Sequence, residues 1–229
     1  MRYIYDINTQ SNSGNQMNFK KITVSFLLLI LINFSANALE LKIPKVGGKK
    51  ADKKVDISEA KLNFTKIFFE SSSEYILAQA YLFDALGMND EASKARKSRE
   101  FSSNKKNKEG KRLTNAFNTV SDNSAALEKA LTKEVALSAE AKVAYAKSLP
   151  HAIKGLLGTI KLPPEAKALL DTLKADKMAA LKMGDFMKIL PKIPQYVSSA
   201  TQVGKLVVTG AKSRGVEGAD DATKALGGL

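Results

Sequence analysis

This chain lacks cysteine and tryptophan, and its 229 residues include a single histidine, His151. Without cysteine the protein can form no disulfides and carry out no thiolate chemistry. Zinc sites need clustered cysteine, histidine or carboxylate side chains, and di-iron bundles need paired Glu-x-x-His motifs. The sequence contains neither pattern. We therefore predict no catalytic residue, no metal site and no cofactor, with chemistry carried out by carboxylates alone, such as glycoside cleavage, left as an alternative.

The lone histidine directly follows Pro150. A Ser–His nucleophile would need a third group to orient the imidazole, and the sequence does not place one. A histidine in a proline turn is more often a surface residue or a locally hydrogen-bonded one, and we favour that interpretation. The chain also lacks a phosphate-binding loop, because Gly155 and Gly158 come without the Lys-Ser/Thr pair. Glycines at this spacing are more typical of close helix crossings.

The N-terminal part of the chain has the pattern of an export signal. Residues 1–16 are polar and rich in Asn and Ser, and we interpret them as lying upstream of the true start at Met17. Residues 17–38 then combine Lys20 and Lys21, an apolar run of about a dozen residues and an Ala36-x-Ala38 end, which is typical of a secretory signal peptide. The run is shorter than the roughly 20 residues of a membrane-spanning helix, although an uncleaved anchor is the alternative. We predict cleavage after Ala38 and a periplasmic or secreted protein of a Gram-negative bacterium.

The remaining chain divides by composition into a leader, a domain and a tail. Residues 39–55 contain Pro44, a Gly-Gly pair and several lysines, so we expect a basic, flexible leader. Residues 56–215 have the length and apolar content of one domain. Residues 216–229 are small and rich in glycine, and we expect a weakly ordered tail.

The central feature of the domain is a predicted helix over residues 57–86. Apolar residues recur in steps of three and four along one side, for example at Phe64 and Ile67, and a second stripe that includes Leu62 lies nearly opposite. A helix that is apolar on two sides is typical of the middle of a helical domain. Asp56 and Glu59 can form a capping box at its start, and Gly87 can end it.

Further helices follow at regular intervals, with almost no alternating pattern that would indicate strands. The sequence predicts an all-α, single-domain helical bundle around the long central helix, with about six further helices. Pro150 falls inside one of them and predicts a kink or a break. We expect these helices over residues 90–103 with Asn89 as the cap, 111–132, from Ser138 through Pro150 to about 160, 164–181, a short piece from 184 to 190, and 195–213 with Gly215 as the stop.

Two segments resemble a loose group of exported helical proteins of Gram-negative bacteria. The shared features are an Ala-rich helix that ends in Leu-Gly, followed by Leu-Pro-x-Ala, Lys-Gly-Leu-Leu and Lys-Leu-x-Pro-Glu-Ala-Lys. They occur here in KLNFTKIFFESSSEYILAQAYLFDALGM and YAKSLPHAIKGLLGTIKLPPEAKALLDT. The resemblance covers about half of the chain after residue 38. It implies export and helicity, and it assigns no activity to any residue.

A candidate polar notch interrupts the central helix. Its members are Glu70, Ser71, Ser73 and Glu74. The two glutamates are one turn apart, so their charges repel unless a cation or a partner lies between them. The notch could line a cleft or bind a cation, whereas the simpler interpretation is a solvated strip balanced by Lys66.

The most distinctive charged feature is a basic stretch over residues 94–112. The chain as a whole has 36 Lys and Arg against 23 Asp and Glu, a formal net charge of +13, and this stretch is its densest part. Such a density attracts polyanions by releasing their counterions. Specific nucleic-acid binding would also need interleaved aromatic residues, and only Phe101 is present. The nine cationic residues are Lys94, Arg96, Lys97, Arg99, Lys105, Lys106, Lys108, Lys111 and Arg112.

Three classes of function follow from these patterns. The one we favour is a non-catalytic envelope protein whose basic stretch binds anionic envelope polymers or a lipid surface. The simpler interpretation of that stretch is a solvated face that aids solubility. The alternatives are a periplasmic carrier of a small hydrophobic or lipid ligand, enclosed in the bundle, and a carboxylate-only hydrolase. The sequence predicts no specific nucleic-acid partner and no transmembrane span after the signal peptide.

Overall fold

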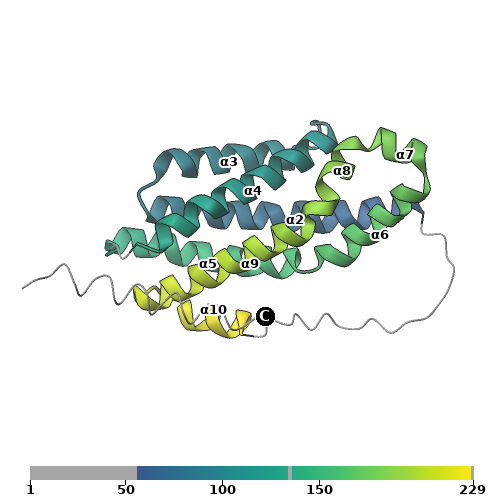
Figure 1. Ribbon diagram of the computed structural model, residues 1–229. Helices are drawn as coiled ribbons and strands as arrows, with labels where there is room; N and C mark the ends of the chain where they lie inside the picture. The colour runs from purple at the N-terminus through teal and green to yellow at the C-terminus, as the bar shows by residue number, and fades with distance from the viewer. Residues whose placement is uncertain (1–55, 134–135, 228–229) are drawn as a thin grey trace, which may run out of the picture. The chain divides into compact units, whose positions relative to one another are not determined.

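The computed structural model describes residues 56–133 and 136–227. Every regular element in these ranges is a helix, and all of them belong to one compact unit, Ala51–Leu229. This confirms the predicted all-α fold. The elements labelled in Figure 1, and one short 3₁₀ helix, are α2 (Ile57–Ala85), α3 (Asn89–Ser103), α4 (Glu109–Leu131), α5 (Ala139–Thr159), α6 (Leu162–Ala175), α7 (Lys177–Lys182), α8 (Gly184–Ile189), η1 (Leu190–Lys192), α9 (Ile193–Ser213) and α10 (Ala219–Leu226).

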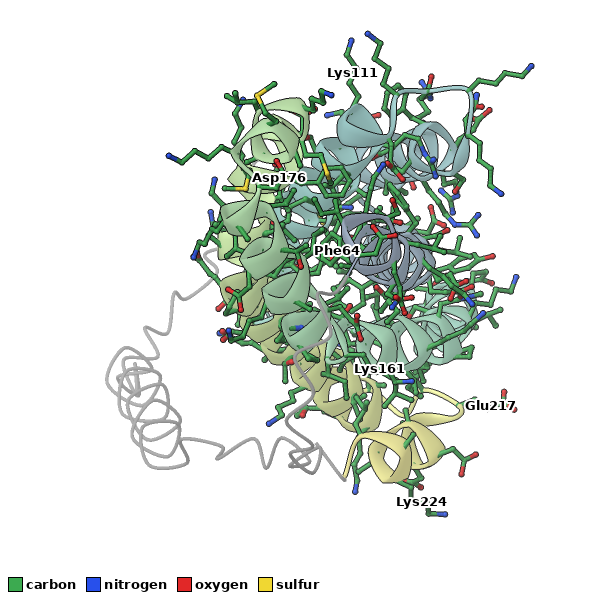
Figure 2. The ribbon with its side chains drawn as sticks, turned by 90° about the vertical axis from the view of Figure 1, so that its right-hand side faces the viewer. Phe64, Lys111, Lys161, Asp176, Glu217 and Lys224 are labelled. Carbon is green, nitrogen blue, oxygen red and sulfur yellow. The ribbon has the colours of Figure 1, made fainter. Side chains whose placement is uncertain are left out.

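The predicted central helix is α2, and α3, α4, α5 and α6 all pack on it. Phe64, Phe68, Ile76 and Phe83 are fully buried along its length, and Figure 2 shows Phe64 in the interior. Apolar side chains leave α2 in more than one direction, so helices on several sides are needed to bury them. Leu62, which the second stripe included, is instead exposed, because no neighbouring helix covers that side of the first turns.

Residues at both ends of α2 define where the helix begins and ends. At the start, the Asp56 carboxylate accepts a hydrogen bond of 3.0 Å from the backbone N–H of Ser58, so Asp56 is the N-cap, although its partner is Ser58 and not the Glu59 of the predicted capping box. At the end, Leu86 is the C-cap and Gly87 adopts a φ of 72°, a conformation that side chains with a Cβ rarely adopt. The helix bounds therefore follow from local sequence.

Glycines let α2 and α5 cross at close range, as their spacing predicted. A Cβ on Gly155 would lie 2.7 Å from the backbone nitrogen of Tyr75, and one on Gly158 would lie 2.6 Å from the Cβ of Ser71. Neither contact is physically tolerable, so only glycine permits this approach. The close crossing brings the polar side chains of α2 within reach of α5.

Pro150 lies inside α5, and the helix is not broken there. Proline removes the N–H that would bond the carbonyl four residues earlier. Pro150 is exposed at the surface. The predicted alternative of a break near residues 148 and 149 is therefore wrong.

The cap of α3 also differs from the prediction. Asn89, expected as the cap of the helix over residues 90–103, is the first residue of α3, and Met88 occupies the cap position without a side-chain bond.

The helix expected over residues 164–181 is two helices, because Asp176 ends α6 and begins α7. Asp176 has extended backbone angles, φ −123° and ψ 97°. Its carboxylate accepts hydrogen bonds of 3.0 Å from the N–H groups of Met178 and Ala179, which makes it the N-cap of α7. The apolar periodicity alone does not reveal this break, since both pieces fit one pattern.

The expected tail also differs from the structure. After Gly218, which has a φ of 80°, residues 219–226 form α10. Val216, Ala219 and Ala222 are buried, and α10 packs on α5 and α9. The helical unit thus extends beyond residue 215, with small side chains that allow a close approach in place of large apolar ones.

The predictions for residues 1–16, for the signal peptide at 17–38 and for the leader at 39–55 fall outside the described residues. Within the described ranges, no helix is both long and apolar enough to span a bilayer.

Candidate functional site

The basic stretch occupies most of α3, the α3–α4 turn and the first turn of α4. The structure divides its nine cations by residue type. The three arginines bind other parts of the protein, whereas the six lysines point to solvent. Each type therefore has its own role.

Arg96 forms an ion pair with Asp84 of α2, with a second hydrogen bond of 3.2 Å between Nη1 and Oδ1. The hydrogen bond to Asp84 raises the pKa of the Arg96 guanidinium above its ordinary value. The same guanidinium lies 5.9 Å from the ring centroid of Tyr81. Such planar contacts are the ones that arginine makes better than lysine.

The other two arginines bond backbone carbonyls. Arg99 donates from Nε to the carbonyl of Ser73 at 3.1 Å, which ties α3 to α2. Arg112 donates from Nε to the carbonyl of Ser102 at 2.6 Å, and its guanidinium lies 4.2 Å from the centroid of Phe69. These bonds tie α3 to α2 and α4 to α3, and each of them uses the Nε–H donor of the guanidinium.

The lysines of the stretch are all exposed, and none forms an ion pair within residues 56–133 and 136–227. Two asparagines shape the turn that carries three of them. The Asn104 side chain accepts from the Lys106 N–H at 3.0 Å, and Asn107 donates to the Phe101 carbonyl at 2.9 Å. The six, termed here the lysine surface, are Lys94, Lys97, Lys105, Lys106, Lys108 and Lys111, and Figure 2 shows Lys111 extending outward.

The structure splits the candidate polar notch. The backbone carbonyl of Ser73 accepts from Arg99 of α3, and Ser73 is not among the residues that line the groove with the other three. Ser71 is buried against Gly158 and bonds its own helix at the Phe68 carbonyl, 3.2 Å away. Glu70 is exposed, and Glu74 is half-buried at the crossing of α2 and α5. The structure thus brings Glu70, Ser71 and Glu74 to one groove and places Ser73 elsewhere.

Glu74 binds two side chains of α5, which sequence reasoning missed. One carboxylate oxygen lies 2.6 Å from Nδ1 of His151, and the other accepts from Lys154 Nζ at 2.9 Å. The His151 ring also stacks on Tyr81, with centroids 5.9 Å apart. His151 is therefore a hydrogen-bonding residue, but its bond is not the local one expected, because its partner is 77 positions away in the chain.

The environment of Glu74 lowers its pKa. Burial alone would raise it, but the hydrogen bonds and positive charges of His151 and Lys154 more than offset that effect. A glycosidase acid needs the opposite, a pKa raised so that the carboxyl carries a proton near neutral pH. Glu74 therefore lacks the electrostatics of a general acid, and this weighs against the hydrolase alternative.

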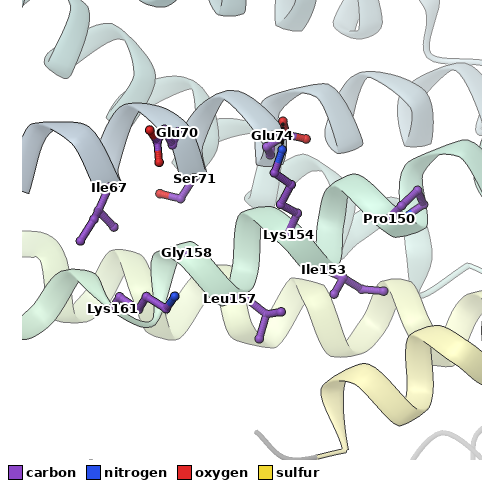
Figure 3. Close-up of a pocket in the computed structure, with 10 residues that line it drawn as sticks. All are labelled: Ile67, Glu70, Ser71, Glu74, Pro150, Ile153, Lys154, Leu157, Gly158 and Lys161. Atoms are coloured by element: carbon purple, nitrogen blue, oxygen red, sulfur yellow. Dashed lines mark hydrogen bonds and ion pairs between the residues drawn. The ribbon is translucent and has the colours of Figure 1, made fainter.

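Beside this cluster, α2 and α5 form an open groove of about 530 Å³ (Figure 3). Its lining combines aliphatic side chains with charged and polar ones, and it opens to solvent at the surface. The carrier alternative predicts an enclosed cavity, which this groove is not. The lining residues are Ile67, Glu70, Ser71, Glu74, Pro150, Ile153, Lys154, Leu157, Gly158 and Lys161.

No group of three or more metal-ligating side chains occurs within the described ranges. Comparison with protein-family models, curated protein sequences and solved structures found no match to this chain. The resemblance to exported helical proteins therefore stays a prediction from the residues that carry it.

Proposed function

We propose that this protein is an exported, non-catalytic envelope component that binds a dense array of anionic groups through the lysine surface. The observation that carries the proposal is the division of labour within the basic stretch. The arginines are engaged with α2 and with the backbone, while six lysines stay exposed without an ion-pair partner in the described structure. Unpaired lysines on ordered elements keep their charge available for external anions.

Dense arrays of anionic groups are found in anionic lipid headgroups and in anionic polymers such as lipopolysaccharide. Both repeat phosphate or carboxylate groups at short spacing, and an ammonium group recognises them as point charges without demanding one geometry. Binding should therefore have little selectivity and should weaken with salt, since screening shortens the range of each charge to about 8 Å at physiological ionic strength.

The test reverses the charge of the α3–α4 turn. Lys105→Glu, Lys106→Glu and Lys108→Glu are combined in one variant, because the three side chains are exposed and form no ion pair within the described residues. Each lysine near an anionic membrane is worth about 1 kcal/mol, so binding to anionic vesicles should fall on the order of 100-fold or more. Co-sedimentation with anionic and zwitterionic vesicles measures binding to a lipid surface, and retention on immobilised heparin measures binding to an anionic polymer.

A matched control separates the local surface from the overall charge. Lys129→Glu, Lys147→Glu and Lys205→Glu change the net charge by the same amount at exposed, unpaired lysines on α4, α5 and α9. This control should bind much better than the turn variant. Equal loss in both variants would reduce the effect to net charge, and equal binding of the unsubstituted protein to anionic and zwitterionic vesicles, with no heparin retention, would overturn the proposal.

A further inference from the structure

A short helix beside the lysine surface exposes two large apolar side chains. No residue of α7 is buried. Met178 is 65% exposed and Leu181 is 78% exposed, the highest value among the large apolar residues described. They are three positions apart, so they project from the same side of the helix. Between them, Ala179 and Ala180 pack on the core, which keeps α7 attached to the protein.

The orientation of α7 is fixed by its cap. The Asp176 carboxylate bonds the N–H groups of Met178 and Ala179, and the extended backbone of Asp176 turns the chain away from α6. At the other end, the N–H of Met183 bonds the carbonyls of Ala179 and Ala180. Met178 and Leu181 are thus held outward by local structure.

Positive charges outnumber negative ones in the segment around α7. Lys174, Lys177, Lys182 and Lys188 are exposed and form no ion pair within the described structure. Among residues 172–190 the only acids are Asp176, whose carboxylate caps the helix, and Asp185. The exposed charges that flank the two apolar side chains in the chain are therefore mainly those of lysines.

Packing places α7 next to the lysine surface. α8 contacts both α7 and α4, and Figure 1 shows α8 between α7 and the α3–α4 turn. Asp185 of α8 lies directly against Gly110, where a Cβ would collide with its carboxylate. Gly110 is flanked by Lys108 and Lys111, so the apolar pair and the lysine surface belong to adjoining elements.

We propose that α7 inserts Met178 and Leu181 into the interface of an anionic lipid bilayer while the neighbouring lysines contact the headgroups. This inference rests on the proposed function and names its partner as a lipid surface. An anionic polymer has no apolar phase in which these side chains could be buried. Amphipathic helices with lysines beside exposed apolar residues bind such interfaces in the plane of the membrane.

Other occupants fit less well. Two side chains offer far less area than the roughly 1,600 Å² of a standard protein interface. A second copy of the chain would also bring its own lysines against these, and like charges repel. An anionic bilayer accounts for both the apolar pair and the surrounding charge.

The absence of tryptophan from the chain makes a direct test possible. Leu181→Trp introduces the only tryptophan at the proposed point of insertion, in the full chain. Its emission should shift to shorter wavelength with anionic vesicles and should be quenched by brominated lipid. Val143→Trp on α5 is the control, since Val143 is also exposed, at 56%, and it should show neither effect.

A second variant tests the energetics. Met178→Gln with Leu181→Gln preserves helix propensity and removes the apolar ends, while Val143→Gln serves as its control. Affinity for anionic vesicles should fall at least about 10-fold in the double variant, since burying each side chain is favourable by the area it removes from water. Heparin retention should not change. Residues 1–55 are the same in all variants, so their contribution cancels in each comparison.

The outcomes separate this inference from the proposed function. Anionic-vesicle binding without a Leu181→Trp emission change, or without an effect of the double glutamine variant, would overturn insertion and leave the lysine surface as the binding site. Heparin retention without vesicle binding would overturn insertion in favour of a polymer. If the unsubstituted protein bound neither anionic vesicles nor heparin, both proposals would be overturned.

Discussion

At the scale of single residues, Glu74 is the clearest link between distant parts of the chain. Its two carboxylate oxygens bind His151 and Lys154, both of α5, so one side chain of α2 joins two helices. The pKa of Glu74 is lowered by these partners despite its partial burial. A carboxyl whose pKa is lower in the folded than in the unfolded state stabilises the protein when it is ionised.

We expect this contribution to depend on pH in one direction. It is complete above the unfolded pKa of Glu74, near the ordinary value of 4.5, and is lost as pH falls through the lower folded pKa. Glu74→Gln should therefore be less stable than the unsubstituted protein at pH 6 to 7, and the difference should shrink below about pH 4.5. Urea unfolding of both proteins across this range measures it. A difference that stays constant down to pH 3 would contradict the role assigned to the Glu74 carboxylate.

The sequence could not predict which side chains of the site pair with one another. The density of lysine and arginine over residues 94–112 predicted the basic stretch, but not which of these side chains bind other parts of the protein. Arg96 is engaged because α3 packs beside Asp84 of α2, and Arg99 because the Ser73 carbonyl is in reach. Side-chain pairing of this kind depends on distances between helices, and those are set only when the domain packs.

At the scale of elements, the crossing of α2 and α5 rests on glycine. Alanine favours a helix by about 1 kcal/mol over glycine, so Gly155→Ala would stabilise an isolated helix. In the protein, its Cβ would lie 2.7 Å from the Tyr75 backbone nitrogen, which cannot move aside as a flexible side chain can. We expect a net loss of stability, since overpacking typically costs about 1–3 kcal/mol.

Gly184→Ala is the matched control for this prediction. Gly184 begins α8, and a Cβ there meets nothing within 4 Å. Thermal unfolding followed by circular dichroism should show a lower Tm for Gly155→Ala and an unchanged or higher Tm for Gly184→Ala. A Gly155→Ala protein as stable as the parent would mean that α2 and α5 can separate at low cost.

Elements with a long periodic pattern and local caps were predictable from sequence. α2 begins after Asp56 and ends before Gly87 because both signals act within a few residues. The division between α6 and α7 was not predictable, since Asp176 serves as a cap only if the helix stops there. α10 was missed because Ala219 and Ala222 carry too little apolar surface to predict burial, although α5 and α9 bury both.

At the scale of the whole molecule, the positive charge behind the net value of +13 is unevenly distributed along the chain. Lysines gather on α3, the α3–α4 turn and the residues around α7, where two apolar side chains are also exposed. The lysines of the α3–α4 turn are exposed, whereas the phenylalanines of α2 at positions 64, 68 and 83 are buried, so charge reversal at this turn should alter binding while leaving the fold intact. Binding and stability should thus respond to different sets of substitutions.

The proposed binding role also requires that the protein meet an anionic surface outside the cytoplasm, which residues 17–38 predict. The Lys20-Lys21 pair, the apolar run and Ala36-x-Ala38 together predict cleavage after Ala38. We expect amino-terminal sequencing of the protein from the periplasmic fraction of a Gram-negative host to begin at Leu39. Substituting Ala38 by a bulky residue should block cleavage and leave the longer form with the membrane fraction, because the peptidase requires small residues at this position. A mature chain that begins at Met1 or Met17 in the cytoplasmic fraction would contradict export, and the lysine surface would then meet intracellular polyanions instead.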